Sequence, residues 1–108
     1  MQEDPKLPYV PMGLESDFAH FSRALAHPAR VTILLEMMKT QGIVEGRVVD
    51  VTGMSPSTVI QHLREMKKSS LIDGRIFGMR SKYWISKEAM EFFRQISQEF
   101  FQAFETLA

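Results

Sequence analysis

The sequence predicts a mainly α-helical domain with one small β-hairpin, in the element order α-α-α-α-β-β-α. Over most of the chain, apolar residues recur every three to four positions, which is the period of a helix buried along one side. Between Ile72 and Ile85 the period changes to two around a glycine, which is typical of two paired strands. Serine and proline also stand where the later helices would begin. These three observations place the hairpin between two helices in the second half of the chain.

Length and composition indicate one globular domain. A chain of 108 residues, with 44% hydrophobic and 24% charged residues, can bury a single core. Because the sequence contains no cysteine, disulfides, thiolate metal sites and cysteine nucleophiles are excluded. No paired carboxylates, nucleophile–base pair or glycine-rich phosphate loop can be recognised, so we expect no enzymatic activity. No apolar run reaches the about 18 residues of a membrane span, which predicts a cytoplasmic protein with no membrane partner.

The first third of the chain predicts an extended arm followed by two helices. Residues 1–14 contain three prolines and one glycine and suit an extended arm, whereas residues 15–108 form the folded domain. Ser16 is the expected N-cap of the first helix. The apolar stripe of this helix consists of Phe18, Phe21 and Leu25. Pro28 suits the first turn of a second helix, because an N–H at that position would be unpaired anyway.

The second helix is expected to form the centre of the core. Its apolar face consists of Val31, Leu34, Leu35 and Met38, widened by Ile33 and Met37. A short third helix is predicted from Val44 to Val51. Val48 and Val51 would point inward, although Gly46 is a weak helix former. A turn at residues 52–54 would end this helix.

The segment after this turn begins with a strong helix-start signal and carries a polar outer face. Ser55 is expected to cap the helix and Pro56 to occupy its first position. The inward stripe consists of Val59, Leu63 and Met66. The opposite face consists of Ser57, Gln61, Arg64 and Lys68. All four side chains can hydrogen-bond to bases or phosphates, so helix, glycine-containing turn and capped helix together indicate a helix-turn-helix with a DNA recognition helix.

The last helix, expected at about residues 86–107 with Ser86 as its cap, is more apolar than one small domain needs. Its stripe consists of Phe93, Ile96, Phe100, Phe104 and Leu107. On a monomer this stripe would be exposed, so we predict a homodimer in which it packs against the same helix of a second copy. Phe18 and Phe21 are expected to join this interface. The alternative is that the stripe only closes the chain's own core.

Basic residues are concentrated in the predicted recognition helix and hairpin, although the whole chain has a net charge of zero. Residues 61–87 carry seven basic and two acidic side chains, whereas residues 1–21 and 88–108 each carry one basic and four acidic side chains. Such a local basic patch is what phosphate binding requires. A solvated run of charges is the other interpretation. The register of the hairpin is not fixed by the sequence. The sequence therefore does not tell which of Arg75, Arg80 and Lys82 extends furthest from the hairpin.

Three stretches resemble the ArsR-type winged-helix repressors. Residues 21–34, FSRALAHPARVTIL, are similar to the opening F-x-x-L-A-D/H-P-x-R-x-x-I-L of that family. Residues 53–64, GMSPSTVIQHLR, resemble its recognition helix G-L-S-x-S-T-V-S-x-H-L-K, and the hairpin within residues 71–84 resembles its wing. The resemblance extends over about residues 16–107. It implies a winged helix-turn-helix homodimer, in the family a repressor, that binds an inverted-repeat operator in a promoter.

The chain departs from the metal-sensing members of that family. They carry a C-x-C element at the start of the third helix, where this chain has Val44 and Gly46. Other members use histidine and acidic ligands on the last helix, and this chain has no histidine after His62. His27 lies at the start of the second helix, and His20 and His62 lie in different elements without ligand spacing. We therefore expect no metal and no other cofactor. The sequence does not tell whether a small apolar effector binds at the dimer interface or whether there is no effector at all.

The predicted DNA contacts divide between phosphates and bases. Phosphate contacts are expected from Ser55 with the first amides of its helix, and from Arg64, Lys67, Lys68, Arg75, Arg80 and Lys82. Base contacts are expected from Ser57, Thr58, Gln61 and His62. A different class of function, a winged helix that binds another protein instead of DNA, would suit the neutral net charge. The polar face of the recognition helix disfavours it, because protein interfaces usually present aromatic anchors.

Overall fold

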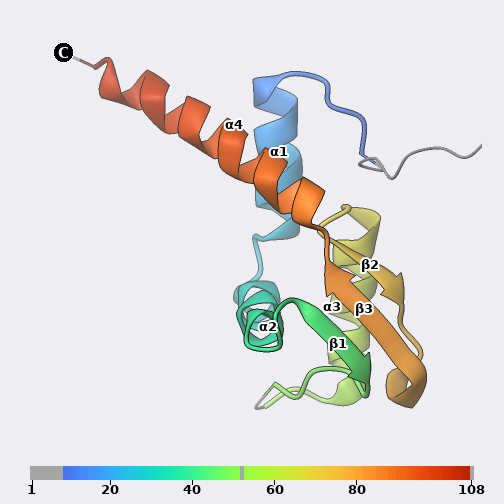
Figure 1. The fold of residues 1–108 in the computed structure, drawn as a ribbon. Helices are drawn as coiled ribbons and strands as arrows, with labels where there is room; N and C mark the ends of the chain where they lie inside the picture. Colours follow the sequence, from blue (N-terminus) through green and yellow to red (C-terminus); the bar gives the residue numbers. More distant parts are fainter. Residues whose placement is uncertain (1–8, 52, 108) are drawn as a thin grey trace, which may run out of the picture.

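The computed structural model describes residues 9–51 and 53–107. Within these residues the chain forms four α-helices, three strands and one 3-10 turn (Figure 1). The elements are α1 (Leu14–Ala24), α2 (Pro28–Met38), β1 (Ile43–Gly46), α3 (Pro56–Lys68), β2 (Ile72–Arg75), η1 (Gly78–Arg80), β3 (Ser81–Ile85) and α4 (Lys87–Glu105). The arrangement is a mainly α winged helix fold, as the sequence predicts.

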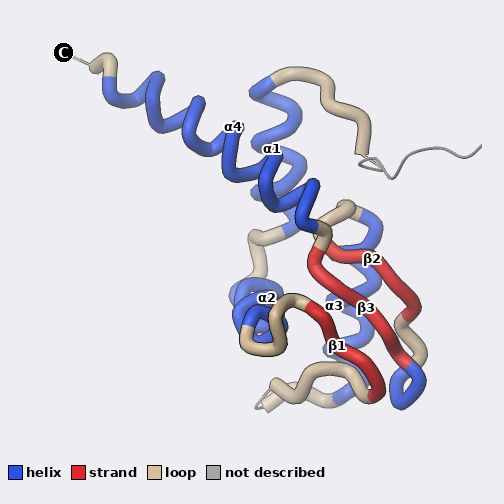
Figure 2. The backbone as a smooth tube through the Cα atoms, in the orientation of Figure 1, coloured by secondary structure: helices blue, strands red, loops and turns tan. Residues whose placement is uncertain are grey.

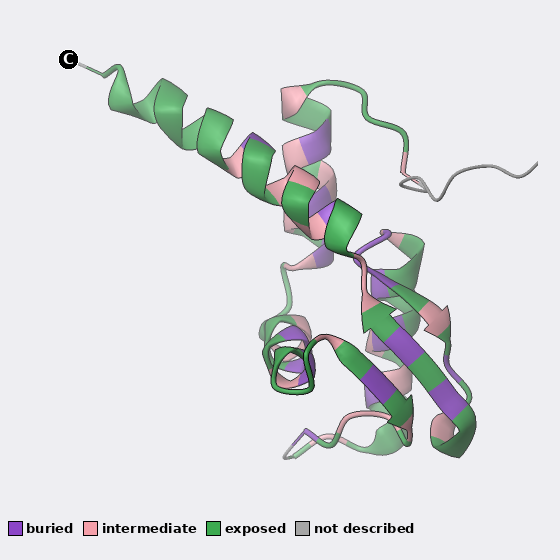
Figure 3. Ribbon diagram, viewed as in Figure 1, coloured by how far each residue is buried: buried purple, intermediate pink, exposed green. Residues whose placement is uncertain are grey.

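The three strands form one antiparallel sheet in the order β1-β3-β2 (Figure 2). Ile43 of β1 lies opposite Trp84 of β3, and Arg75 of β2 lies opposite Lys82. Side chains of β3 alternate between the two faces of the sheet, so that Tyr83 is buried while Lys82 and Trp84 are exposed (Figure 3). The sheet therefore has one face in the core, toward α2 and α3, and one open face.

The predicted third helix, Val44 to Val51, is wrong. Its first part is strand β1, and the residues up to Val51 are not helical. Gly46 has φ +103°, outside the helical region, and the valines are β-branched, so both favour extended chain over helix. The backbone N–H of Val49 donates to Tyr83 Oη at 2.7 Å, which replaces a helical hydrogen bond. Val51 is buried as predicted. Of the predicted turn, Thr52 lies outside the described residues.

The prediction for the inward face of α2 is only partly right. Ile33, Leu34 and Met37 are buried in the core, on the side of α2 that faces α3 and the sheet. Val31, Leu35 and Met38, which were expected to point inward, are exposed. The physical reason is that α2 is apolar on nearly all sides, so spacing alone cannot tell which stripe meets the core.

The N-terminus of α1 is held by Asp17 and not by Ser16, so the expected serine cap is wrong. Gly13 is the N-cap residue and makes no side-chain hydrogen bond. The buried Asp17 carboxylate accepts hydrogen bonds from Tyr9 Oη at 2.7 Å, Met12 N at 2.9 Å and Gly13 N at 3.1 Å. Burial raises the pKa of Asp17, but these hydrogen bonds outweigh it and lower the pKa below its ordinary value.

Of the predicted arm, residues 9–13 are non-helical, and residues 1–8 lie outside the described residues. Tyr9 stacks on His20 of α1 at 3.9 Å between ring centroids, so the described end of the arm lies against the domain. The hydrogen bond to Asp17 raises the pKa of Tyr9, with burial and the charge of Asp17 adding to it.

Helix α4 packs its first half on α1 and extends away from the domain with its second half (Figure 1). Ser86 caps it as predicted, with Ala89 N donating to Ser86 Oγ at 3.1 Å. Phe21 and Ile96 are already buried within the single chain. The last turns leave large apolar side chains in solvent, with exposed fractions of 43% for Phe100, 54% for Phe101, 62% for Phe104 and 73% for Leu107. No helix in the described part of the chain is both long and apolar enough to cross a membrane.

Candidate nucleic-acid interface

Helix α3 presents the polar face that the sequence predicts. Ser55 Oγ accepts a hydrogen bond from Thr58 N at 3.3 Å, and Pro56 follows at the first position of the helix. The inward stripe of Val59, Leu63 and Met66 is fully buried. The outward side chains Ser57, Gln61, Arg64 and Lys68 are all exposed. They line a shallow groove along α3 together with Ile60 and Glu65. Burial of one stripe therefore fixes the direction in which the polar face points.

Hydroxyl groups gather at the N-terminus of α3. Ser55 Oγ lies 2.9 Å from Thr58 Oγ1 and 3.2 Å from Ser57 Oγ. All three residues are exposed. The first backbone N–H groups of a helix have no partner within the helix, and its dipole favours negative charge there. This end of α3 can therefore hold a phosphate oxygen beside three hydroxyl groups.

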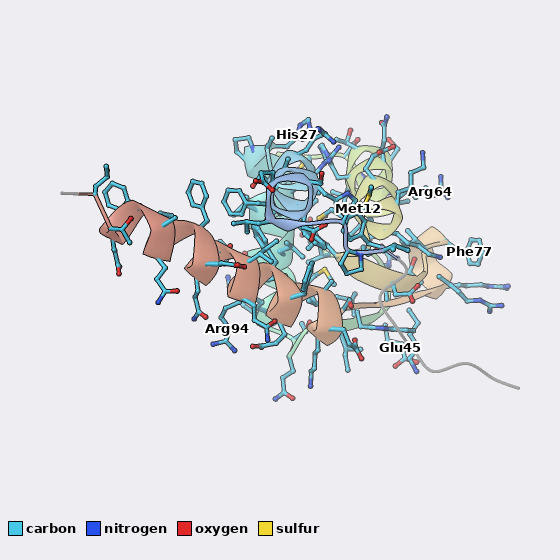
Figure 4. All side chains as sticks on the ribbon, turned by 90° about the horizontal axis from the view of Figure 1, so that it is seen from above. Met12, His27, Glu45, Arg64, Phe77 and Arg94 are labelled. Carbon is cyan, nitrogen blue, oxygen red and sulfur yellow. The ribbon has the colours of Figure 1, made fainter. Side chains whose placement is uncertain are left out.

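Two cations of α3 reach toward the hairpin. Arg64 donates from its guanidinium to the Ile76 carbonyl at 3.5 Å, and Lys67 Nζ donates to the Gly74 carbonyl. Lys68 lies 3.6 Å from Glu65 in an exposed ion pair, which solvent screens strongly. Figure 4 shows Arg64 and Phe77 on the same side of the molecule. The polar face of α3 and the end of the hairpin thus belong to one surface.

The hairpin supplies the remaining predicted cations. Arg75 and Lys82 face each other across β2 and β3, and Arg80 lies in the connecting turn η1; all three are exposed. The register thus places Arg75 and Lys82 as a pair and puts Arg80 at the tip. Phe77 and Met79 are exposed beside Arg80, and the sequence reasoning gave them no role. Their position in the turn between two strands was the sequence signal that could have predicted their exposure at the hairpin tip.

Arg30 is a third residue to which the sequence pattern assigned no role. Its Nε donates to His62 Nδ1 at 3.0 Å, and its Nη1 donates to the Ala24 carbonyl at 3.2 Å. Since Nδ1 of His62 accepts this hydrogen bond, the ring proton of the neutral imidazole is on Nε2. Arg30 of α2 thereby sets the tautomer of a side chain that belongs to α3.

Comparison with known proteins identifies the kind of protein to which this surface belongs. No protein-family model and no solved structure matches the chain. The HTH-type transcriptional regulator YgaV of Escherichia coli (strain K12) is 35% identical to this chain over 68 residues, which span 63% of this chain and 69% of YgaV. The chain belongs to the helix-turn-helix transcriptional regulators. In this regulator, α3 with its buried stripe and polar face is the element that fits the predicted recognition helix.

The electrostatic surroundings of His62 in this regulator disfavour its charged form. Burial, then the charge of Arg30, then that of His27 lower the pKa of His62 below its ordinary value of 6.5. The rings of His27 and His62 are 5.7 Å apart between centroids. His62 is therefore neutral at pH 7, with Nε2–H as its remaining donor.

Replacing His62 by glutamine is expected to change how the stability of the regulator depends on pH. A histidine whose pKa is lower in the folded state than in the unfolded chain binds fewer protons when folded. Stability should therefore be fully present above pH 6.5 and fall as the pH drops below it, by at most about 1.4 kcal/mol per pH unit for this one group. Urea unfolding of wild type and His62→Gln from pH 5 to pH 8 measures the slope. Arg30→Gln should give an intermediate slope. Identical slopes for His62→Gln and wild type would show that His62 does not contribute to the pH dependence of stability.

The described residues hold no group of three or more histidine, cysteine or acidic side chains that could bind a metal ion. His20 instead lies with Nε2 2.8 Å from the Ser69 carbonyl oxygen, while its ring packs on Tyr9. This contact joins α1 to the C-terminal end of α3. The position of His20 in this regulator is thus accounted for by packing.

The residues predicted for a dimer interface fall into two groups. Phe21 and Ile96 are buried in the core, and Phe93 is half-buried against Phe21, with ring centroids 5.5 Å apart. Phe18 is also half-buried and stacks on Phe100 at 4.5 Å. The exposed group consists of Phe100, Phe104 and Leu107. The first group serves the core of one chain, and the second forms an apolar face on the outer half of α4.

Proposed function

We propose that this regulator binds a specific DNA sequence, an inverted-repeat operator in a promoter, as a homodimer. The observation that carries the proposal is the polar, exposed face of α3 on the same side as the basic hairpin. An α-helix of this size fits the major groove of B-DNA, and a hairpin beside it can follow the backbone or the minor groove. The resemblance to ArsR-type repressors makes repression the proposed sign of regulation, in the cytoplasm and without a metal or other cofactor.

Base reading in this proposal rests on residues near the N-terminal half of α3. Gln61 can form two hydrogen bonds with adenine, and the methyl group of Thr58 can meet that of a thymine. Ser57 adds a hydroxyl that donates or accepts, and His62 adds the Nε2–H group that Arg30 leaves as the donor.

Phosphate binding rests on the cations around α3 and the hairpin and on the hydroxyl-lined end of α3. Arg64 and Lys67 already lie toward hairpin carbonyl groups, so binding would exchange these contacts for contacts with phosphates. Arg75, Arg80, Lys82 and Lys68 extend into solvent. In a dimer each contact occurs twice, so the affinity should fall steeply with salt.

The homodimer rests on the apolar face at the end of α4. Phe104 and Leu107 are exposed by 62% and 73%, and a single soluble domain rarely leaves such a face open. Pairing with the same face of a second copy is closed and symmetric, and it doubles the DNA-binding surface. The two half-sites of the operator would then lie about one helical turn apart.

Selection of bound duplexes from a random pool, with the affinity of the winners followed against salt, tests the proposal. We expect enrichment of an inverted repeat with half-sites about one helical turn apart and a steep salt slope. Enrichment of a single, unrepeated site would contradict the homodimer. If no sequence is enriched and weak binding vanishes at about 0.15 M salt, the protein is a protein-interaction module or a regulator that needs a ligand to recognise DNA.

Gln61→Ala and Arg80→Ala are expected to separate base reading from phosphate binding. Gln61→Ala should relax the preference at one base pair per half-site and cost about 1–3 kcal/mol against the preferred base, with an unchanged salt slope. Arg80→Ala should weaken all sequences alike and flatten the salt slope. Titrations of each variant against the selected operator and its single-base variants measure both effects. If Gln61→Ala keeps the wild-type preference, another residue reads that base pair.

A second candidate function, a winged helix that binds a protein, is favoured by one observation. Phe77 and Met79 are exposed at the hairpin tip, where they could serve as apolar anchors. The same side chains can also contact the minor groove, where apolar wedges between base steps are common. The selection experiment decides between the two, because a protein-binding module would enrich no DNA sequence.

A further inference from the structure

A cavity of about 790 Å³ lies between the C-terminal end of α2, the open face of the sheet and the first turns of α4. This volume is within the range of about 300–1,000 Å³ that is usual for small-molecule sites. Arg94, one of its lining residues, lies with Glu45 on one side of the molecule, whereas His27 lies on the opposite side (Figure 4). The cavity is also distinct from the groove along the polar face of α3.

The floor of the cavity is apolar and includes an aromatic ring. Trp84 and Ile43 are paired across β3 and β1 on the open face of the sheet, and they are 38% and 51% exposed. Met38 of α2 and Met90 of α4 complete the floor from two sides. Leaving this much apolar surface in water is unfavourable, and thioether side chains adapt to the shape of what covers them. The indole of Trp84 can pair favourably with another aromatic ring, offset-stacked or edge-to-face.

The rim of the cavity is charged but balanced. Lys87 and Arg94 contribute two positive charges, and Glu88 and Glu91 contribute two negative charges. Arg94 donates to Glu91 at 2.7 Å, which neutralises this pair locally. A rim without net charge gives no electrostatic preference for an anion or a cation. The cavity therefore suits an uncharged molecule with a flat, apolar ring system.

The size of the cavity favours a small molecule over a protein. Eleven residues line it, whereas a stable protein–protein interface takes about 20–30 residues from each partner. Residues of α2, β1, β3 and α4 line the cavity, so a bound molecule would contact the floor and the flanking helices while one side stays open to solvent.

We propose that this cavity binds an uncharged aromatic small molecule, and that the ligand changes the affinity of the regulator for DNA. The second half of this statement rests on the function proposed above. Trp84 lies two residues from Lys82 on β3, the strand that also pairs with β2 of the hairpin. Ile85 N donates to the Gly42 carbonyl at 2.8 Å, and Ser86 N donates to the Leu71 carbonyl at 2.9 Å, so the end of β3 at the cavity floor is joined to the residues that precede both edge strands, β1 and β2. A ligand wedged between β3 and α4 would shift the hairpin relative to the helix proposed to form the dimer.

Trp84 lies in the floor of the cavity and is the one tryptophan in the sequence, so all energy transfer from tryptophan to a bound probe comes from this position. The probe is N-phenyl-1-naphthylamine, an uncharged aromatic that accepts energy from excited tryptophan. We expect saturable energy transfer from Trp84 to the probe in full-length protein without DNA. 1-Anilinonaphthalene-8-sulfonate has the same ring system plus a negative charge, and it should bind no more tightly. Markedly tighter binding of the sulfonate would contradict an uncharged ligand, and the lack of saturable transfer would contradict the site itself.

Matched glutamate variants locate the probe. Ile43→Glu and Met38→Glu each place a charge on the apolar floor at an exposed position and should weaken binding of the probe by at least about tenfold. Phe101→Glu makes the same change on the exposed outer part of α4 and should leave the affinity unchanged. Circular dichroism checks that each variant is folded. If one floor variant does not fold, the other still tests the site. The reverse pattern, with only Phe101→Glu weakened, would place the probe on α4.

The effect on DNA is measured separately, by titrating the selected operator with and without saturating probe. A change in DNA affinity of about fivefold or more supports the regulatory half of the proposal. Unchanged DNA affinity with bound probe would show a ligand site without regulation and contradict that half. If the protein binds no DNA sequence at all, the function proposed above fails, while the result of the energy-transfer experiment stands by itself.

Discussion

Gly74→Ala is expected to destabilise the domain strongly, with a loss of more than about 10 °C in Tm. Gly74 has φ +121°, and a Cβ added there would lie 2.3 Å from the Lys82 carbonyl oxygen and 2.6 Å from Tyr83 Cα. The strained φ alone costs roughly 1–3 kcal/mol in a residue with a side chain. The contacts are with the backbone of β3, so relief requires separating β2 from β3. Thermal unfolding followed by circular dichroism measures the loss, and DNA affinity should fall with it.

Gly78→Ala is the matched control for this prediction. Gly78 lies in the same hairpin with φ +71°, but a Cβ there would meet nothing within 4 Å. Its substitution should therefore cost only the strain of a positive φ in a residue with a side chain, on the order of 1 kcal/mol in the free energy of unfolding. Equal Tm values for the two variants would mean that β2 and β3 do not approach as closely at Gly74 as described.

Helix α3 was predictable from sequence because several independent signals agree there. The capping serine, the proline after it and the buried stripe all favour a helix with the same boundaries and orientation, and the structure confirms each of them. Helix α4 and strands β2 and β3 were predicted for the same reason. Where the local preference for a helix or strand agrees with the pattern of buried residues, distant contacts change the secondary structure little.

Strand β1 and the orientation of α2 were not predictable, because distant contacts decide both. As a strand, Ile43–Gly46 needs β3 as its partner, and β3 lies almost 40 positions later in the chain. The valines that suggested a helical stripe are β-branched and favour an extended segment once a partner strand is present. Helix α2 is apolar on nearly all sides, so the position of α3 and the sheet selects its buried face.

The candidate site divides in the same way. Its polar face on α3 follows from the sequence, whereas the hydrogen bond from Arg30 to His62 joins residues 32 positions apart and has no local signal. The pairing of Arg75 with Lys82 also required the register of the sheet. Residue types thus predict which chemistry is present, and tertiary contacts decide which groups stay free to use it.

Replacing Phe104 and Leu107 together by serine is expected to convert the proposed homodimer into monomers. Both side chains are mostly exposed in the single chain, so their removal should change the stability of the monomer little. Affinity for the inverted repeat should fall by about 10²–10⁴-fold, because the second half-site no longer benefits from a linked partner. Affinity for an isolated half-site should be unchanged. Sedimentation velocity measures the oligomeric state, and titrations of the inverted repeat and of the isolated half-site measure the two affinities.

Leu35→Ser is the matched control, since Leu35 is also an exposed apolar side chain but lies on α2. It should leave both the oligomeric state and the preference for an inverted repeat as in wild type. A Phe104→Ser/Leu107→Ser protein that stays dimeric would mean that α4 does not hold the copies together. A monomeric variant that keeps full affinity for the inverted repeat would instead separate dimerisation from DNA binding. Only joint loss of both properties supports α4 as the element that couples two recognition helices to one operator.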